Sequence, residues 1–136
     1  MQISARVEYA VRAALELAAR EPVAVSLDEL ARAQELPPGF LDAILRELRR
    51  GGLLRVRRGA LNGYVLCGPA ASIFVGDVMR AASGPLLEVR GVHPTQLSYA
   101  GAAQHLTEVW IALQASIRGV LDEITLQDVL TGCVAS

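Results

Sequence analysis

Residues 26–66 read SLDELARAQELPPGFLDAILRELRRGGLLRVRRGALNGYVL, and this stretch decides the fold of the chain. Ser26 and Glu29 form the pair of a capping box, which predicts a short helix through residue 34. Pro37-Pro38 separates this helix from a second one over residues 38–50. The apolar positions of the second helix recur at the spacing of a core-facing stripe: Leu41, Ile44, Leu45 and Leu48.

A β-hairpin is predicted after the glycine pair that ends the second helix. In residues 53–57, Leu54 and Val56 alternate with Arg55 and Arg57, so one strand face is apolar and the other is cationic. Residues 58–63 contain the glycines and asparagine of a hairpin tip, and residues 64–67 return as the partner strand. This order predicts a winged helix-turn-helix domain in a chain that is mainly α with a small β-hairpin.

Positive charge is concentrated in the same stretch. Six arginines fall within thirteen residues, with Glu47 the only acid among them: Arg46, Arg49, Arg50, Arg55, Arg57 and Arg58. The whole chain has a net charge of −1, but residues 1–68 carry +2 and residues 69–136 carry −3. All thirteen basic residues are arginine, which suits bidentate contacts to phosphate and guanine, although we favour codon bias as the main cause. The distribution indicates nucleic acid as the counter-charge.

The outward row of the second helix has the properties of a recognition helix. Near its start the side chains are short, so the backbone could approach base edges, and Asp42 could accept a hydrogen bond from a cytosine amino group. Arg46 and Arg50 would follow the groove wall. The same row is equally consistent with a solvated helix face. The three outward arginines of the predicted wing favour DNA binding.

The chain divides into a winged domain over residues 1–82, a sensor-type loop over 83–97 and a C-terminal part over 98–136. The winged domain should begin with a helix over 6–20, with an apolar stripe of Val7, Val11, Ala14, Leu15 and Ala18, and should include a short capped helix near 72–80.

The C-terminal part should hold one helix from about 98 to 123, roughly 39 Å long, followed by a short helix capped by Thr125. An unbroken heptad seam follows that long helix: Tyr99, Ala103, Leu106, Trp110, Leu113, Ile117, Val120 and Ile124. We favour a homodimer along this seam over packing of the helix on its own domain.

Composition limits the other function classes. The 136 residues are 52% hydrophobic, enough for one sizeable core, and no apolar run is long enough to cross a bilayer. The N-terminus lacks the features of a signal peptide, so we expect a cytoplasmic protein without a membrane partner. Cys67 and Cys133 are far apart and predict neither a disulfide framework nor a zinc finger. The sequence has no nucleophile with a base at recognisable spacing, no paired-carboxylate motif and no phosphate loop, so we expect no enzyme and no cofactor.

Several motifs together resemble the Rrf-two family of small bacterial winged-helix regulators, which includes IscR, NsrR and CymR. The resemblance covers nearly the whole chain, and its order and spacing are more specific than any single motif. It rests on residues 7–11 (VEYAV), 36–41 (LPPGFL), 58–66 around the wing, 72–78 and 124–130 (ITLQDVL). It implies a homodimer joined by the long helix, with two winged helices placed on a near-palindromic operator in double-stranded DNA, and repression or dual regulation of transcription.

Departures from the family pattern carry further information. Cluster-binding members hold three cysteines in the loop that here spans about 88–104, where this chain has none, and a late ligand position is Thr107 here. The resemblance therefore implies a regulator without an iron-sulfur cluster, controlled by a small molecule or a partner protein. The alternatives are an atypical metal or cluster sensor using Glu8, His93 and His105, or a protein-interaction adaptor with the same fold that does not bind DNA. Residues 61–63 replace a run of three glycines in many relatives, which leaves the groove contacts of the wing tip open.

The residues expected to carry these functions form two sets. The candidate DNA-contacting residues are Tyr9, Gly39, Asp42, Ala43, Arg46, Arg50, Arg55, Arg57, Arg58, Gly59 and Asn62. The candidate dimer-interface residues are Tyr99, Leu106, Trp110, Leu113, Ile117, Val120 and Ile124. Asp42, Ala43 and Arg46 are expected near base edges, and the other arginines near phosphates or the minor groove.

Overall fold

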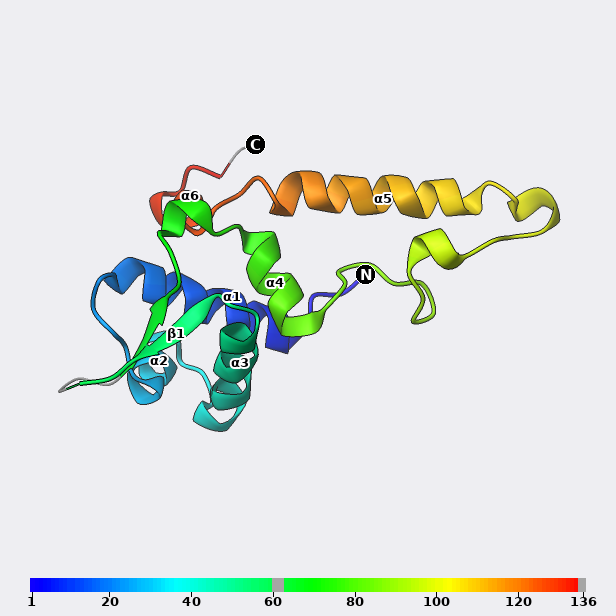
Figure 1. The fold of residues 1–136 in the computed structure, drawn as a ribbon. Helices are drawn as coiled ribbons and strands as arrows, with labels where there is room; N and C mark the ends of the chain where they lie inside the picture. The colour runs from blue at the N-terminus through cyan, green and yellow to red at the C-terminus, as the bar shows by residue number, and fades with distance from the viewer. Residues whose placement is uncertain (60–62, 135–136) are drawn as a thin grey trace.

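The computed structural model describes residues 1–59 and 63–134 and shows a mostly helical chain with one two-stranded antiparallel hairpin (Figure 1). The N-terminal part contains α1 (Ala5–Arg20), α2 (Leu27–Gln34), α3 (Pro38–Arg50), β1 (Leu54–Arg57) and β2 (Gly63–Leu66). The remainder contains α4 (Val75–Ser83), α5 (Leu106–Leu121) and α6 (Leu126–Thr131), with short 3-10 turns η1 (Ala70–Ser72), η2 (Pro94–Gln96) and η3 (Gly101–Ala103). The predicted winged helix-turn-helix is confirmed.

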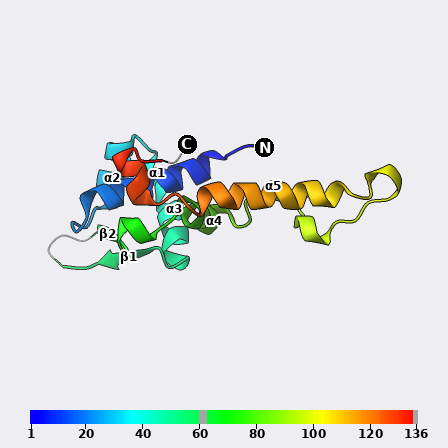
Figure 2. The same ribbon diagram turned by 90° about the horizontal axis from the view of Figure 1, so that it is seen from above.

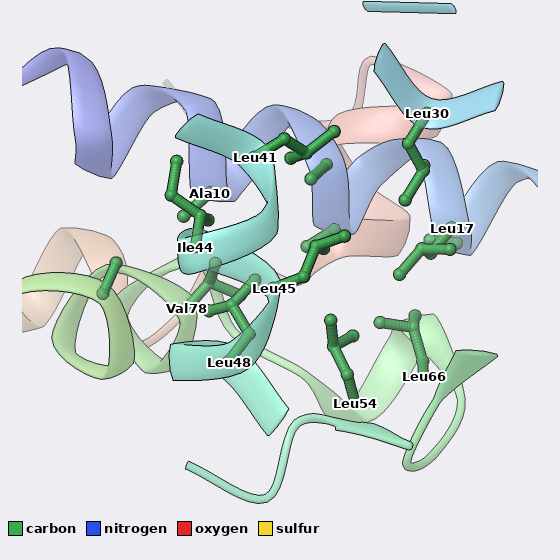
Figure 3. Close-up of a cluster of buried hydrophobic side chains, with 14 of the residues drawn as sticks. Ala10, Leu17, Leu30, Leu41, Ile44, Leu45, Leu48, Leu54, Leu66 and Val78 are labelled. Carbon is green, nitrogen blue, oxygen red and sulfur yellow. The ribbon is translucent and has the colours of Figure 1, made fainter. Parts of the chain in front are cut away.

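Helix α1 lies at the centre of the winged domain. It packs against α2, α3, α4, α6 and β2, and Figure 3 shows Ala10 and Leu17 among the side chains of α3, α4 and the hairpin. The predicted apolar stripe of α1 packs on the core, with Val11 and Leu15 half-buried, but the prediction omitted the buried residues Ala10, Ala13 and Leu17. The buried residues of this helix are Val7, Ala10, Ala13, Ala14, Leu17 and Ala18. A helix that is surrounded buries a wider arc than a single stripe, and its alanines let neighbouring elements approach closely.

The α2–α3 unit follows the prediction closely. Ser26 Oγ accepts a hydrogen bond from the Glu29 backbone N–H at 3.2 Å, and Ser26 Oγ also donates to the Glu29 carboxylate at 3.2 Å. Helix α3 has the predicted bounds and buries the predicted side chains Leu41, Ile44, Leu45 and Leu48. These four side chains point into the core (Figure 3). Because they anchor one face of α3, the opposite face is held toward solvent.

The wing is tied to the domain through the backbone of Val25. Leu54 pairs with Leu66 and Arg57 with Gly63 in the hairpin, and Val25 forms an isolated bridge to Tyr64 on the other edge of β2. Gly63 packs directly on this bridge, since a Cβ atom there would lie 2.7 Å from the Val25 carbonyl carbon. The close approach of two backbones therefore requires glycine at position 63.

The C-terminal helix is shorter than predicted. Helix α5 begins at Leu106 rather than near residue 98, so its 16 residues span about 24 Å. The preceding residues form only η3, where Gly101 has φ +61°, outside the right-handed helical region. Segment 84–105 and α5 together form an arm that extends away from the winged domain, as both Figure 1 and Figure 2 show. The heptad spacing of apolar residues from Tyr99 onward is present in the sequence, but only the residues from Leu106 onward form a continuous helix.

The return of the chain after α5 anchors the arm. Thr125 caps α6 by accepting from the Asp128 N–H at 3.1 Å, as predicted, and Leu126 is fully buried. The Val75 N–H donates to the Ile124 carbonyl at 2.9 Å, and the Leu126 N–H donates to the Ile73 carbonyl at the same distance. The start of α4 and the end of the arm are thereby joined through the backbone.

Candidate nucleic-acid interface

The exposed face of α3 carries small side chains and one aromatic ring near its start and arginines near its end. Gly39 and Phe40 are exposed in the first turn, Asp42 and Ala43 are half-buried, and Arg46, Arg49 and Arg50 are exposed further along. The predicted residues of this row therefore share one side of the helix. Small side chains at the N-terminal end leave room for a base edge, and guanidinium groups at the other end suit phosphate.

Two ion pairs on this face were not predicted. Arg46 lies 3.1 Å from the Asp42 carboxylate, and Arg50 lies 2.8 Å from Glu47. The Arg46 and Asp42 side chains are 65% and 49% exposed, so their pair is a surface salt bridge that contributes about 0–1 kcal/mol. Phosphate or a base can therefore replace the internal partner at little cost. The i, i+4 and i, i+3 spacings were visible in the sequence and could have shown both pairs.

The wing presents three exposed arginines, as predicted, but they differ in their contacts. Arg57 Nη1 donates to the Pro22 carbonyl at 2.7 Å and so links β1 to the α1–α2 connection. Among the described residues, Arg55 and Arg58 make no side-chain hydrogen bond or ion pair. Gly59 is exposed with φ +148°, and the predicted contact residue Asn62 lies outside the described residues. Arg55 and Arg58 are thus the wing arginines that have no internal partner to give up when they bind a ligand.

The predicted residue Tyr9 lies on α1, half-buried, with the Arg12 guanidinium 5.6 Å from its ring centre. Arg12 also pairs with Glu8 at 3.2 Å and donates to both the side chain and the backbone carbonyl of Gln34. Gln34 ends α2, so this arginine caps the helix that precedes the turn into α3. The sequence analysis did not identify Arg12, because Arg12 and Gln34 are 22 residues apart and no pattern among neighbouring residues indicates their contact.

A polar chain continues along the α1–α2 boundary. Gln34 Nε2 donates to Glu16 Oε1 at 2.8 Å, and Arg20 Nε donates to Glu16 Oε2 at 2.8 Å. These hydrogen bonds from Arg20 and Gln34 hold the pKa of the Glu16 carboxyl below its usual value, against the opposing effect of burial. The network fixes α2 on α1, and through α2 it orients the turn that leads into α3.

Phe40 is a second residue that sequence reasoning missed. Its side chain is 65% exposed in the first turn of α3, beside Gly39. Phe40 does not belong to the core-facing row at i, i+3 and i+4 spacing, so the sequence could have predicted an exposed aromatic side chain here. On the face of a recognition helix, a phenyl ring can contact a thymine methyl group.

The predicted interface residues occupy two environments on the arm. Trp110 Nε1 donates to the Tyr99 hydroxyl at 3.0 Å, and Leu106, Leu113, Ile117 and Ile124 are half-buried within the single chain. Val120 is 56% exposed, and two apolar residues outside the predicted seam, Val109 and Ile111, are 55% and 43% exposed. No residue of α5 is buried. Part of the predicted seam therefore packs on segment 84–105, while Val109 and Val120 form an open apolar strip beside it. Ile111, two residues after Val109, lies on the opposite side of the helix.

The residues of the alternative metal site do not meet. Glu8 pairs with Arg12, and His105 Nδ1 lies 3.2 Å from Glu108. His93 Nδ1 accepts from the Thr95 N–H at 3.3 Å. Over residues 1–59 and 63–134, no three His, Cys, Asp or Glu side chains are grouped in a way that could hold a metal ion, and both cysteines are exposed. These donors do not fit an iron ion or an iron-sulfur cluster.

No helix in the described part of the chain combines the length and the hydropathy needed to span a bilayer.

Comparisons with known proteins agree with the fold. The family model of the Rrf2 (Rrf-two) proteins, described as an iron-dependent transcriptional regulator, matches residues 3–132. A Mycobacterium tuberculosis protein named as an HTH-type transcriptional regulator is 47% identical over 98% of this chain and 84% of its own. The transcriptional regulator CymR of Bacillus subtilis is 30% identical over 94% of this chain and 88% of its own.

Two solved structures show the same architecture. The structure of CymR, the global cysteine regulator of B. subtilis, superimposes with a TM-score of 0.78 at 30% identity and covers 96% of this chain and 97% of its own. The structure of T. potens IscR gives a TM-score of 0.77 at 32% identity and covers 98% of this chain and 88% of its own. The similarity therefore includes the arm as well as the winged domain.

Proposed function

The chain belongs to the Rrf2 family of transcriptional regulators, and we propose that it is a homodimeric repressor that binds a near-palindromic operator in the cytoplasm. Its family consists of regulators, not enzymes. The observation that carries the proposal is the α3 face, where small residues precede exposed arginines beside an exposed wing arginine. This arrangement suits a helix that enters the major groove while the wing contacts the neighbouring backbone or minor groove.

Each contact residue has a role in this proposal. Gly39, Asp42, Ala43 and Arg46 face base edges, and Arg46 exchanges its pairing with Asp42 for contacts to DNA. Phosphate or minor-groove contacts come from the remaining candidates: Arg50, Arg55, Arg57, Arg58, Gly59 and Asn62. Arg57 keeps the wing on the α1–α2 connection through Pro22. Tyr9 acts through the α1–α2 boundary, together with Arg12.

The open face of α5 supports the homodimer. No side chain of this 16-residue helix is fully buried, so the single chain supplies only part of the tertiary packing that normally stabilises a helix. Val109 and Val120 are more than half exposed and lie eleven residues apart, which brings them to the same side of the helix. A second copy would cover this face and would place two α3 helices on one duplex.

Selection from a random duplex library with the purified full chain tests the proposal. We expect enrichment of two inverted half-sites. The triple variant in which Arg46, Arg50 and Arg58 are replaced by alanine should no longer bind the enriched duplexes. Arg90→Ala, in segment 84–105, is the matched control and should bind as the wild type does. Absence of any enriched sequence would favour the adaptor function instead.

A further inference from the structure

A cavity lies where the arm joins the winged domain, and we call it the joint cavity. It has a volume of about 220 Å³ and is lined by residues of α4, segment 84–105 and α5, among them Arg80, Leu86, His93, Gln114, Ile117 and Arg118. The DNA-contacting face of α3 contributes nothing to it. The joint cavity is therefore separate from the proposed operator contacts.

The polar groups of the joint cavity favour an anion. Arg118 makes no side-chain hydrogen bond or ion pair with any described residue, so its guanidinium is available to a ligand. Arg80 is already paired with Asp122 and lies 3.6 Å from Asp77, which holds it at the cavity wall. Among the residues that the structure describes, no carboxylate lines the cavity itself. A guanidinium recognises a carboxylate through two parallel hydrogen bonds.

The rest of the cavity lining favours an organic anion. Gln114 Nε2 lies 3.2 Å from His93 Nε2, so these two side chains form one polar edge. Leu86 and Ile117 supply apolar surface beside it. The cavity volume of about 220 Å³ is smaller than that of the pockets that hold drug-sized ligands. The space suits a short chain of carbons more than a bulky ring system.

We propose that the joint cavity binds a small organic carboxylate with a short apolar chain, its charge on Arg118 and its chain against Leu86 and Ile117. The regulatory consequence rests on the proposed repressor function. Arg80 belongs to α4, which packs on α1 and α3, whereas Gln114 and Arg118 belong to the arm. A ligand that binds Arg118 and also contacts Arg80 at the cavity wall is held by both parts, so it stabilises one angle between them and one spacing of the two recognition helices in a dimer.

Binding is tested by calorimetry on the full chain without DNA, using the straight-chain carboxylates from acetate to hexanoate. We expect one saturable site per chain, with affinity that rises by about fourfold per methylene until the cavity is full and then falls. Pentanamide, which lacks the charge, should bind at least about tenfold more weakly than pentanoate. Inorganic phosphate should not compete with pentanoate.

Two variants locate the site. Arg118→Gln should weaken pentanoate binding by about tenfold or more, while Arg90→Gln, which removes an exposed arginine outside the cavity, should leave it unchanged. Arg118 is itself exposed, so its replacement should not disturb folding, and circular dichroism checks this. The proposal is overturned if no carboxylate in the series binds, if affinity ignores chain length, if phosphate competes, or if Arg118→Gln binds as the wild type does.

Operator titration with and without saturating pentanoate tests whether carboxylate binding also changes the affinity for DNA. A change in operator affinity of about threefold or more supports control through the joint cavity. Carboxylate binding with no change in operator affinity would overturn the regulatory role. Carboxylate binding by a protein that selects no DNA would leave the cavity assignment standing and would refute the repressor function.

Discussion

Arg58 follows β1 and is exposed without a side-chain partner among the described residues, whereas Arg57 beside it is bound to the Pro22 carbonyl. Because Arg58 has no internal partner to give up, its replacement tests a wing contact to DNA more directly than replacement of Arg57 does. An arginine that neutralises one phosphate contributes about one unit to the slope of log affinity against log salt. A single substitution at Arg58 therefore tests whether the wing contacts DNA.

Replacing Arg58 with alanine should lower operator affinity and reduce the salt slope by about one. The loss follows from the removal of one charge next to the duplex. Fluorescence anisotropy across a salt titration measures both quantities, with Arg90→Ala as the control. A variant with unchanged slope and affinity would remove the wing from the interface.

Replacing Asp42 with alanine has a different expected result. The change removes a possible acceptor for a cytosine amino group and also releases Arg46 from its 3.1 Å ion pair. Preference at one base position should relax, while affinity for random DNA should hold or rise because a negative charge has gone. Sequencing of selected duplexes measures the preference. A profile identical to that of the wild type would show that Asp42 reads no base.

At the scale of elements, the wing and the α1–α2 pair are each held by contacts between segments. The hairpin depends on the backbone approach at Gly63 and Val25, and α2 depends on Glu16, Arg20 and Gln34. Neither contact touches the proposed DNA face. Both determine where that face lies relative to the core.

Gly63→Ala should destabilise the protein by about 1–3 kcal/mol, because the new Cβ would meet three Val25 backbone atoms at 2.7–2.8 Å. Gly68→Ala is the control, since a Cβ there would have no neighbour within 4 Å. Urea denaturation gives the free energy of unfolding of each. Equal stability of the two variants would contradict a rigid junction between β2 and Val25.

Glu16→Gln should lower the free energy of unfolding at neutral pH by about 1 kcal/mol. The pKa of this carboxyl is lowered in the folded protein by hydrogen bonds from Arg20 and Gln34. Its contribution is therefore fully present above the ordinary value of 4.5 and is lost as pH falls through the folded value. The difference from the wild type should shrink in acid. Glu88→Gln, at an exposed position, is the control, and a constant difference at all pH values would refute the role of ionised Glu16.

The whole molecule consists of a winged domain and a projecting arm, as Figure 2 shows. Within one chain the arm covers part of α5 with segment 84–105 and leaves Val109, Ile111 and Val120 exposed. The predicted interface included Leu113 and Ile117, which the structure places half-buried in the chain itself. Assembly and arm folding must therefore be tested with different residues.

Val109→Asp combined with Val120→Asp should convert the proposed dimer to a folded monomer, because both side chains are exposed in the single chain. Leu113→Asp with Ile117→Asp should in addition disturb the arm, since it would bury charge within the chain. Light scattering measures mass, and circular dichroism measures helix content. Val23→Asp, which is 58% exposed on the α1–α2 connection, is the control. A wild-type mass for the Val109/Val120 variant would place the interface elsewhere, whereas a monomer should also bind the operator more weakly.

Local signals in the sequence were sufficient for the central part of the fold. Ser26 with Glu29, the apolar row of α3 and the alternation in β1 each depend on neighbours within a few residues, and all three were predicted correctly. The cap of α6 at Thr125 belongs to the same class. Capping and amphipathic periodicity are local properties, so they can be recognised without knowing what the helix packs against.

The sequence by itself thus determined the winged helix-turn-helix, the row of α3 that faces outward and the family to which the chain belongs. Only the tertiary structure decided the burial pattern of α1, the tether of Arg57 to Pro22, the start of α5 at Leu106 and the joint cavity. These features arise where segments far apart in the chain meet. The energy of each contact depends on which two surfaces are brought together. Periodicity in the sequence predicts that a side chain will be buried, but it does not predict which segment will cover it.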